Sequence, residues 1–176
     1  MDWPVRVTFP VFDRATATFD AHHQTVQALA ETLTEQAEQL VANTPPTAAS
    51  DLMDAIKAAV RAFTGEEGLA APSKTLIVFS DMFVQSTRHD FSTDALSSAG
   101  IRSLIQDERT GERLPNLTGV KVWVAGAGAA SKGGASTGKT KQVRAFWLEY
   151  FKACGADLPG KRYAERLAKF SLVARK

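Results

Sequence analysis

The stretch Thr75-Leu76-Ile77-Val78-Phe79-Ser80-Asp81 is the part of the sequence that decides the fold. It is short, rich in residues that favour strands, and apolar from Leu76 to Phe79. Such a run, without polar alternation, is typical of a strand buried on both faces in a parallel sheet covered by helices. In these sheets ligands bind beyond the carboxyl ends of the strands. Asp81 falls at that point, where a carboxylate serves either as a ligand or as a turn residue.

The composition predicts one soluble globular domain. The chain has 176 residues, of which 44% are hydrophobic and 23% charged, values that exclude disordered and fibrous classes. No apolar run approaches the length that spans a bilayer, and the first residues do not resemble a signal peptide. The single cysteine, Cys154, excludes an internal disulfide and fits a small core residue in a reducing compartment. We therefore expect a cytoplasmic protein.

Hydrophobic periodicity predicts alternating strands and helices. The expected helices cover residues 24–41, 50–63, 93–107, 140–154 and 164–167, and the expected strands cover residues 5–12, 74–80, 117–125 and 170–173. Ser50 is the expected N-cap of the second helix. The alternation favours an α/β fold in which a three-layer, Rossmann-like and mostly parallel sheet is flanked by helices. One low-complexity segment, the Gly/Ala/Ser-rich residues 126–138, is expected to form a loop.

A first candidate site joins a hydroxyl at a helix N-terminus to a carboxylate at the tip of a strand. The hydroxyl is that of Ser50, with Thr47 as an alternative, and the carboxylate is that of Asp81. Hard oxygen ligands of this kind suit Mg²⁺ or Ca²⁺. Two residues are too few to specify a metal site by themselves.

Four stretches of the chain together resemble a von Willebrand factor A-type domain of the plain bacterial intracellular kind. They are Ser50-Asp-Leu-Met-Asp-Ala-Ile56, Leu76-Ile-Val-Phe-Ser-Asp81, Leu117-Thr-Gly-Val-Lys-Val-Trp-Val124 and Phe146-Trp-Leu-Glu-Tyr-Phe151. The resemblance covers about residues 5–155. It implies a non-enzymatic protein–protein interaction module whose partner docks over the loops after residues 47, 80 and 125. It also places on Ser50 and Asp81 two of the three motifs of a metal-ion-dependent adhesion site, where a partner carboxylate completes the coordination of Mg²⁺.

The first motif of that family, Asp-x-Ser-x-Ser, has no match in the chain. The nearest sequence, Asp13-Arg-Ala-Thr-Ala17, has alanine at both serine positions. Residues 5–12 resemble the second strand of the family rather than its first. We therefore expect either a chain that begins after the central strand or a divergent member, in both cases with a degenerate or incomplete adhesion site. A missing strand leaves a sheet edge that favours homo-oligomerisation or completion by another chain.

An alternative function is suggested by a literal Walker A match, Gly133-Gly-Ala-Ser-Thr-Gly138-Lys139-Thr140. In an NTP-binding loop, backbone N–H groups wrap the phosphates, the lysine reaches the β- and γ-phosphates, and the threonine holds Mg²⁺. Gly138, Lys139 and Thr140 are the cofactor-binding residues under this interpretation. The expected strand ends near Ala125, some seven residues before Gly133, whereas a P-loop follows its strand directly. A glycine-rich loop that leads into a helix is the preferred interpretation.

Charged and histidine-containing segments give weaker signals. Residues 132–176 contain eleven Lys and Arg against three acidic residues, a pattern compatible with nucleic acid or an acidic partner. Few aromatic residues interleave with these charges, so a solvated helix face is favoured over nucleic-acid binding. Phe146, Trp147, Tyr150 and Phe151 lie along one side of the helix expected over residues 140–154, and they are interpreted as core packing rather than as a stacking platform. His22-His23 is interpreted as a solvated pair. His89-Asp90 is interpreted as a polar pair in a loop, although it also has the composition of a base with an orienting carboxylate.

Overall fold

The computed structural model describes residues 18–43, 51–71, 73–129 and 136–166. The chain divides into two compact units, Met1–Thr47 and Ala48–Lys176. The described part of the first unit is helix α1 (Phe19–Asn43), which confirms the helix predicted over residues 24–41. The predicted strands 5–12 and 170–173 lie outside the described residues. None of the described helices is both long enough and apolar enough to cross a membrane.

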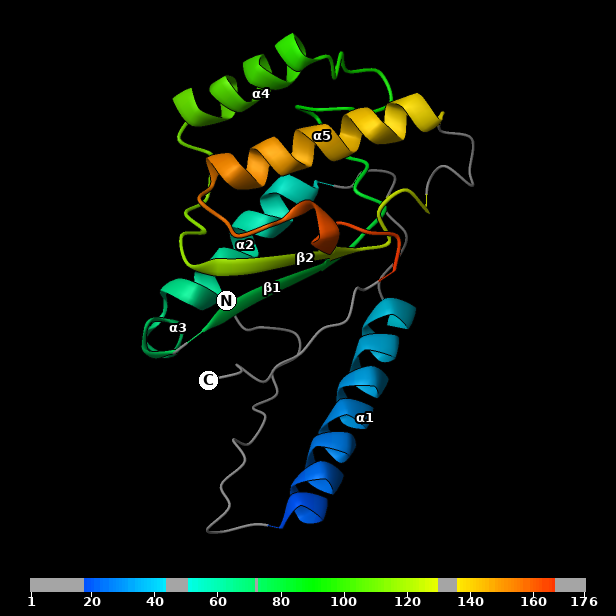
Figure 1. Ribbon diagram of the computed structural model, residues 1–176, viewed down its shortest axis with the longest axis vertical. Helices are drawn as coiled ribbons and strands as arrows, with labels where there is room; N and C mark the ends of the chain where they lie inside the picture. Colours follow the sequence, from blue (N-terminus) through cyan, green and yellow to red (C-terminus); the bar gives the residue numbers. More distant parts are fainter. Residues whose placement is uncertain (1–17, 44–50, 72, 130–135, 167–176) are drawn as a thin grey trace. The chain divides into compact units, whose positions relative to one another are not determined.

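The second unit is built on two parallel strands, β1 (Lys74–Phe79) and β2 (Val120–Ala125). They pair in register from Lys74 opposite Val120 to Phe79 opposite Ala125 (Figure 1). The other edge of β2 carries parallel bridges to Asp157 and Tyr163, in the segment that follows the last helix. A mixed α/β architecture with a parallel sheet is thus confirmed. The sheet has two strands within the described residues, so the predicted three-layer arrangement stays a prediction.

The prediction that β1 is buried on both faces is wrong for the described structure. Val78 is buried, whereas the side chain of Phe79 is 74% exposed. Successive side chains of a strand point to opposite faces, and Leu76 and Val78 belong to the core-facing set. The apolar run therefore reflects one buried face and one face that the described part of the second unit does not bury.

The helices of the second unit begin at side-chain caps that differ from those predicted. Helix α2 (Leu52–Thr64) is capped by Asp51, whose carboxylate accepts a hydrogen bond from the amide of Asp54, and not by Ser50. Helix α4 (Ser98–Thr110) is capped by Ser97 and starts five residues later than predicted. Helix α5 (Thr137–Ala153) is capped by Ser136, and α3 (Glu66–Ala70) and a 3₁₀ helix, η2 (Gly160–Arg162), complete the elements. Residues 164–166, which were predicted to begin a short helix, are not helical.

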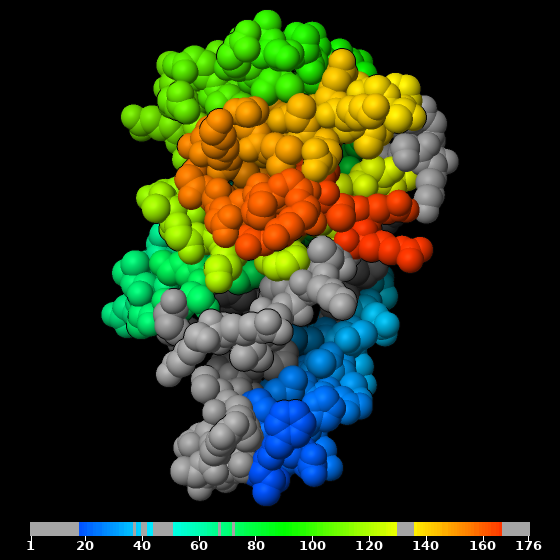
Figure 2. All heavy atoms as spheres, viewed as in Figure 1, coloured from blue at the N-terminus to red at the C-terminus, as the bar shows by residue number. Residues whose placement is uncertain are grey.

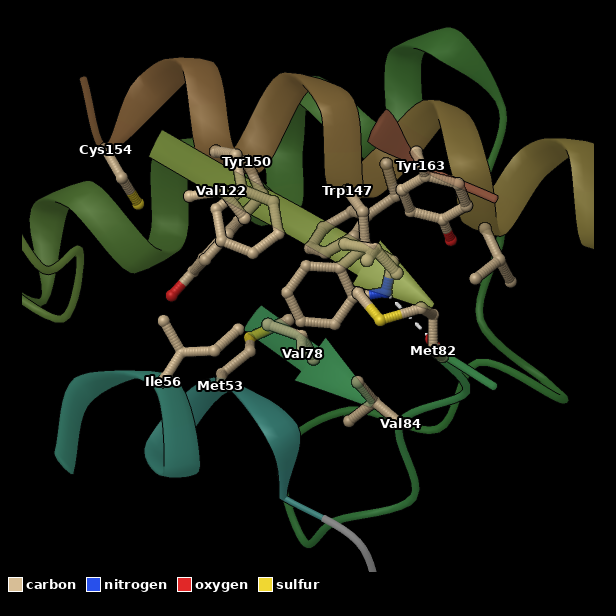
Figure 3. Close-up of a cluster of buried hydrophobic side chains, with 14 of the residues drawn as sticks. Met53, Ile56, Val78, Met82, Val84, Val122, Trp147, Tyr150, Cys154 and Tyr163 are labelled. Carbon is tan, nitrogen blue, oxygen red and sulfur yellow. Dashed lines mark hydrogen bonds between the residues drawn. The ribbon is translucent and has the colours of Figure 1, made fainter. Parts of the chain in front are cut away.

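The core lies between the inner face of the sheet and helices α2 and α5. Four of its five largest fully buried side chains come from α5, as the aromatic pattern of the sequence predicts. They form edge-on and tilted ring pairs around Trp147 (Figure 3). Met53 and Ile56 of α2 meet these rings from the opposite side. Cys154 is buried at the end of α5, and burial raises the pKa of its thiol to about 12. This environment confirms a core cysteine and keeps it protonated at neutral pH.

Candidate functional site

The turn after β1 uses the side chain of Asp81 as a hydrogen-bond acceptor. Its Oδ1 accepts the amide of Phe83 at 2.9 Å, and the Oγ of Ser80 accepts the amide of Met82 at 2.9 Å. Both bonds join a residue i to the backbone of residue i+2, which is the geometry of Asx and related turns. Asp81 therefore lies at the predicted place, the tip of the strand, and its observed role is to shape the turn.

Met82 adopts a backbone conformation that is uncommon outside glycine. Its φ angle is 70° and its side chain is fully buried. The indole Nε1 of Trp147 donates a hydrogen bond to the carbonyl oxygen of Met82 at 2.7 Å. Backbone strain of this kind persists only where the surroundings over-determine it, and it gathers at binding and active sites. The core helix α5 therefore fixes the exit of the chain from β1.

The tips of the two strands approach each other closely. Gly126, the first residue after β2, has a φ angle of 90°, and a Cβ atom there would lie 2.9 Å from the carbonyl oxygen of Ser80. Only glycine fits this position. The amide of Gly128 donates to the carbonyl oxygen of Asp81 at 3.3 Å. The turns after β1 and β2 thus form one connected surface at the carboxyl end of the sheet.

Between β1 and α4 the chain forms a long ordered loop, residues 81–97, which we call the strand-end loop. Val84, Phe91 and Leu96 are buried beneath it together with Met82. Within the loop the amide of Phe91 donates to the carbonyl oxygen of Val84 at 2.9 Å, and the amide of Ser86 donates to the carbonyl oxygen of His89 at 2.8 Å. The loop therefore has its own apolar base and its own backbone hydrogen bonds.

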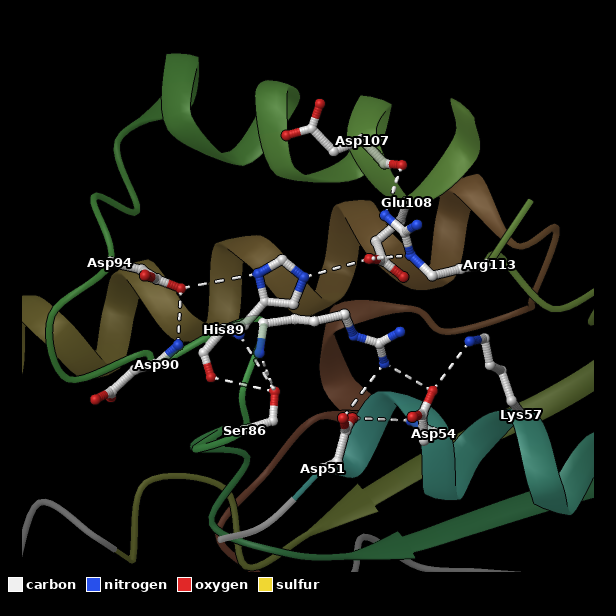
Figure 4. A network of polar contacts seen from close by, with 11 residues as sticks. Asp51, Asp54, Lys57, Ser86, His89, Asp90, Asp94, Asp107, Glu108 and Arg113 are labelled. Carbon is white, nitrogen blue, oxygen red and sulfur yellow. Dashed lines mark hydrogen bonds and ion pairs between the residues drawn. The ribbon is translucent and has the colours of Figure 1, made fainter. Parts of the chain in front are cut away.

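His89 anchors this loop to α4 through a buried ionic network (Figure 4). Its Nε2 lies 3.3 Å from Oε1 of Glu108, which also accepts the Nε of Arg113 at 2.8 Å. Its Nδ1 lies 3.9 Å from the carboxylate of Asp94. Because an ionised carboxylate only accepts hydrogen bonds, Nε2 of His89 carries the proton in this contact. His89 is therefore a loop residue, as the sequence predicts, but it is buried and anchors the loop.

Glu108 is fully buried at the centre of the network. Burial raises the pKa of its carboxyl group, but the hydrogen bonds from Arg113 and His89, and their charges, outweigh burial and hold the pKa below its ordinary value. Arg113 also donates to the carbonyl oxygen of Asp107 at 2.9 Å. The ionised form of Glu108 is thus the form that the native structure favours.

A second ionic cluster ties the strand-end loop to the start of α2. Arg88 reaches Asp54 at 2.8 Å and Asp51 at 3.3 Å, and Lys57 reaches Asp54 at 3.0 Å. The hydrogen bonds from Arg88 and then Lys57 hold the pKa of Asp54 below its usual range. Since these side chains are partly exposed, the cluster positions the loop more than it stabilises the fold.

The predicted metal pair cannot be assembled from the described residues. Ser50 and its alternative Thr47 lie outside them, and Asp81 has one oxygen engaged by the turn. In the described ranges no three His, Cys, Asp or Glu side chains gather as a metal site requires. The Mg²⁺ site at Ser50 and Asp81 therefore stays a prediction.

The Walker A-like residues Gly138, Lys139 and Thr140 form the first turn of α5. The Nζ of Lys139 donates to the carbonyl oxygen of Asp94 at 2.7 Å. The hydroxyl of Thr140 donates to the carbonyl oxygen of Ser136 at 3.3 Å. Residues 130–135, which contain the first glycines of the match, lie outside the described residues. In the described structure Lys139 fastens α5 to the strand-end loop, and NTP binding stays a prediction.

Two substitutions at Asp81 separate its role in the turn from the predicted role in Mg²⁺ binding. We expect Asp81→Ala to lower the free energy of unfolding by about 0.5–1.5 kcal/mol, because the amide of Phe83 loses its acceptor. Asp81→Asn keeps an acceptor oxygen and is expected to unfold close to wild type in urea titrations. A melting temperature that rises with MgCl₂ in wild type but not in Asp81→Asn would support the predicted metal site instead.

The residues that hold the strand-end loop are mostly ones that the sequence did not single out. Glu108 and Arg113 gave no signal, and Trp147 was predicted as a core residue without its hydrogen bond to Met82. Comparisons with protein-family models, with curated proteins and with solved structures gave no match to the chain. The function of the strand-end loop is therefore inferred from its own geometry.

Proposed function

We propose that this chain is a non-enzymatic protein–protein interaction module of the von Willebrand factor A type, which docks a partner protein on the strand-end loop. The observation that carries the proposal is the fixed conformation of this loop at the carboxyl end of a parallel sheet. In sheets of this kind ligands bind beyond the carboxyl ends of the strands. The proposal includes the three-layer fold of that family, with the two described strands as part of a larger, mostly parallel sheet.

A fixed loop suits docking because less conformational entropy is lost when the partner binds. The strand-end loop is held from below by Trp147, from the side by Glu108 through His89, and from α2 through Arg88. Its exposed side chains are small, polar or charged: Gln85, Thr87, Arg88, Ser92, Thr93, Ala95 and Ser97. A scaffold that positions exposed polar groups on a rigid loop is the usual form of a recognition surface.

The polar side chains in the strand-end loop and next to it are engaged in contacts that hold the loop in place. Asp81 accepts the amide of Phe83, His89 contacts Glu108, and Lys139 donates to the carbonyl oxygen of Asp94. Asp90 accepts both the amide and the hydroxyl of Ser92. These engagements support a binding surface rather than an acid–base centre, where a group must be free to exchange a proton with a substrate.

The docking proposal does not depend on a metal ion. Under the family resemblance, Ser50 and Asp81 would hold Mg²⁺ and a partner carboxylate would complete its coordination. The alternatives of NTP binding through Lys139 and Thr140, and of nucleic-acid binding through the basic residues 132–176, stay predictions. A titration with a fluorescent ATP analogue and a mobility-shift assay at two salt concentrations test them.

Substitution of Thr87 tests the docking surface. Its side chain is exposed on the strand-end loop, so Thr87→Arg adds bulk and charge without disturbing the core. We expect at least a tenfold loss of the partner protein that co-purifies with the tagged chain from its native cells, as for a residue near the centre of an interface. Quantitative mass spectrometry of the co-purified proteins provides the measurement.

Ser103→Arg is the matched control, since Ser103 is also a small exposed hydroxyl residue but lies on α4. It should leave the co-purified partner unchanged. If both variants retain the same proteins in wild-type amounts, or if wild type retains none above an untagged control, the strand-end loop is not the docking surface.

A further inference from the structure

An open groove lies between helices α4 and α5 on the surface of the second unit. Figure 2 shows α4 in green lying against α5 in yellow to orange. The groove has a volume of about 900 Å³. Its lining residues recur at helical spacing along both helices; those that carry the argument are Ile101, Arg102, Ile105 and Arg109 from α4, and Leu148 and Lys152 from α5.

The floor of the groove is apolar. Ile101 and Ile105 of α4 are its buried residues, and Leu148 of α5 is half-buried. Ala145 and Ala153, which also line it, are small and leave the space between the helices open. A concave apolar strip between two helices accepts the apolar face of a third helix.

The rim of the groove is basic. Arg102 and Arg109 lie one above the other on exposed positions of α4, and Lys152 faces them from α5. Among the described residues no carboxylate pairs with Arg102 or Arg109, and the guanidinium of Arg109 donates to the amide oxygen of Gln106 at 3.5 Å. Glu149 is the one acidic residue among the lining residues, and it pairs loosely with Lys152 at 3.8 Å. Three basic groups against one acid give the rim a net positive charge.

We propose that this groove binds an acidic amphipathic helix of a partner protein. The apolar face of such a helix fits over Ile101, Ile105 and Leu148, and carboxylates on its flanks face Arg102 and Arg109. Residues 98–109 of α4 extend over roughly 16 Å at 1.5 Å per residue, which matches about three turns of the bound helix. The exposed charges choose the partner and its orientation. The apolar contact comes mainly from Leu148, Ala145 and Ala153, because Ile101 and Ile105 are already largely covered by the core.

Nucleic acid fits the groove less well, although it too is acidic. The lining residues include no aromatic ring on which a base stacks. A phosphate backbone would contact the basic rim and leave the apolar floor uncovered. The groove thus differs from the strand-end loop, where the exposed side chains are mostly polar or charged. The partner helix proposed for the groove is independent of the partner proposed for the loop.

The test is a fluorescence-anisotropy titration of the full chain with three labelled peptides of about 14 residues. The first carries leucine at positions i, i+3 and i+7 and glutamate on both flanks. The second has lysine in place of each glutamate, and the third has serine in place of each leucine. We expect saturable binding of the first peptide only, with affinity that weakens several-fold between about 50 mM and about 300 mM NaCl.

Variants of the groove assign the binding to this site. Arg102→Glu combined with Arg109→Glu should weaken binding of the acidic peptide by at least about tenfold, and Ala145→Gln should weaken it without a change in charge. The matched control combines Lys121→Glu with Lys161→Glu, two exposed lysines outside the groove, and should bind like wild type. Far-ultraviolet circular dichroism confirms that each variant is folded.

Three results would overturn the proposal: no saturable binding of the acidic peptide, equal binding of the basic peptide, or full binding by the Arg102→Glu/Arg109→Glu variant. Thr87→Arg should bind the acidic peptide like wild type. The groove and the strand-end loop can therefore fail separately.

Discussion

Replacement of Trp147 by alanine is expected to lower the free energy of unfolding by about 3–5 kcal/mol. The indole is fully buried among Phe146, Tyr150 and Phe151, so its removal leaves a large cavity. Trp147→Phe keeps most of the ring but leaves the carbonyl oxygen of Met82 without its donor. We expect this variant to lose about 1–3 kcal/mol, the cost of an unsatisfied buried polar group together with a partial loss of packing. Urea unfolding followed by circular dichroism measures both values.

Leu69→Ala provides the control for this pair. Its side chain is 69% exposed on α3, so its removal should change the free energy of unfolding by less than about 0.5 kcal/mol. A Trp147→Phe variant as stable as the control would show that the bond to Met82 does not hold the exit from β1.

Removal of the carboxylate of Glu108 has the second large expected effect. Glu108→Ala leaves Arg113 and His89 without their shared acceptor in a buried position. Breaking one side of a buried ionic network costs about 3–5 kcal/mol. Because Arg113 is partly exposed and can regain water, we expect about 2–4 kcal/mol. Glu108→Gln keeps an acceptor oxygen and should be destabilised less.

The same network predicts how stability depends on pH. The folded-state pKa of Glu108 is lower than its ordinary value, so its ionised form stabilises the native state at pH values above the pKa of the unfolded chain, about 4.3. That stabilisation is lost as the pH falls through the folded-state pKa. The difference in unfolding free energy between wild type and Glu108→Gln should therefore shrink when the pH falls from about 6 to about 3. A difference that does not vary with pH would contradict the role of the ionised carboxylate.

The parts of the fold that the sequence predicted correctly are those with strong local patterns. Strand β1 follows from its apolar run and helix α5 from the aromatic residues along one side of it. Strand β2 was found with its first residue misplaced by three positions. The place of Asp81 at the tip of β1 and the burial of Trp147 and Cys154 follow from the same patterns. Hydrophobic periodicity predicts secondary structure reliably where one face of an element is buried along its whole length.

The parts that it missed depend on contacts between distant residues. Glu108 lies on α4 and Arg113 in the turn after it, and no sequence feature pairs Glu108 with His89 across nineteen positions. Helix propensity does not decide between adjacent polar residues as N-caps. It therefore missed both the cap of α2, which is Asp51 rather than Ser50, and the late start of α4 at Ser98. The exposure of Phe79 depends on which face of the sheet is covered, and an uninterrupted apolar run does not reveal that.

Amide hydrogen exchange of residues 82–96 tests most directly whether the strand-end loop is a preformed surface. The amides of Phe83, Ser86 and Phe91 all donate to acceptors within the loop. The structure predicts that these amides exchange about as slowly as those in the middle of α5, and that Trp147→Phe accelerates exchange in the loop more than in α5. Exchange of these amides in wild type at the rate of an unstructured peptide would contradict a fixed docking surface.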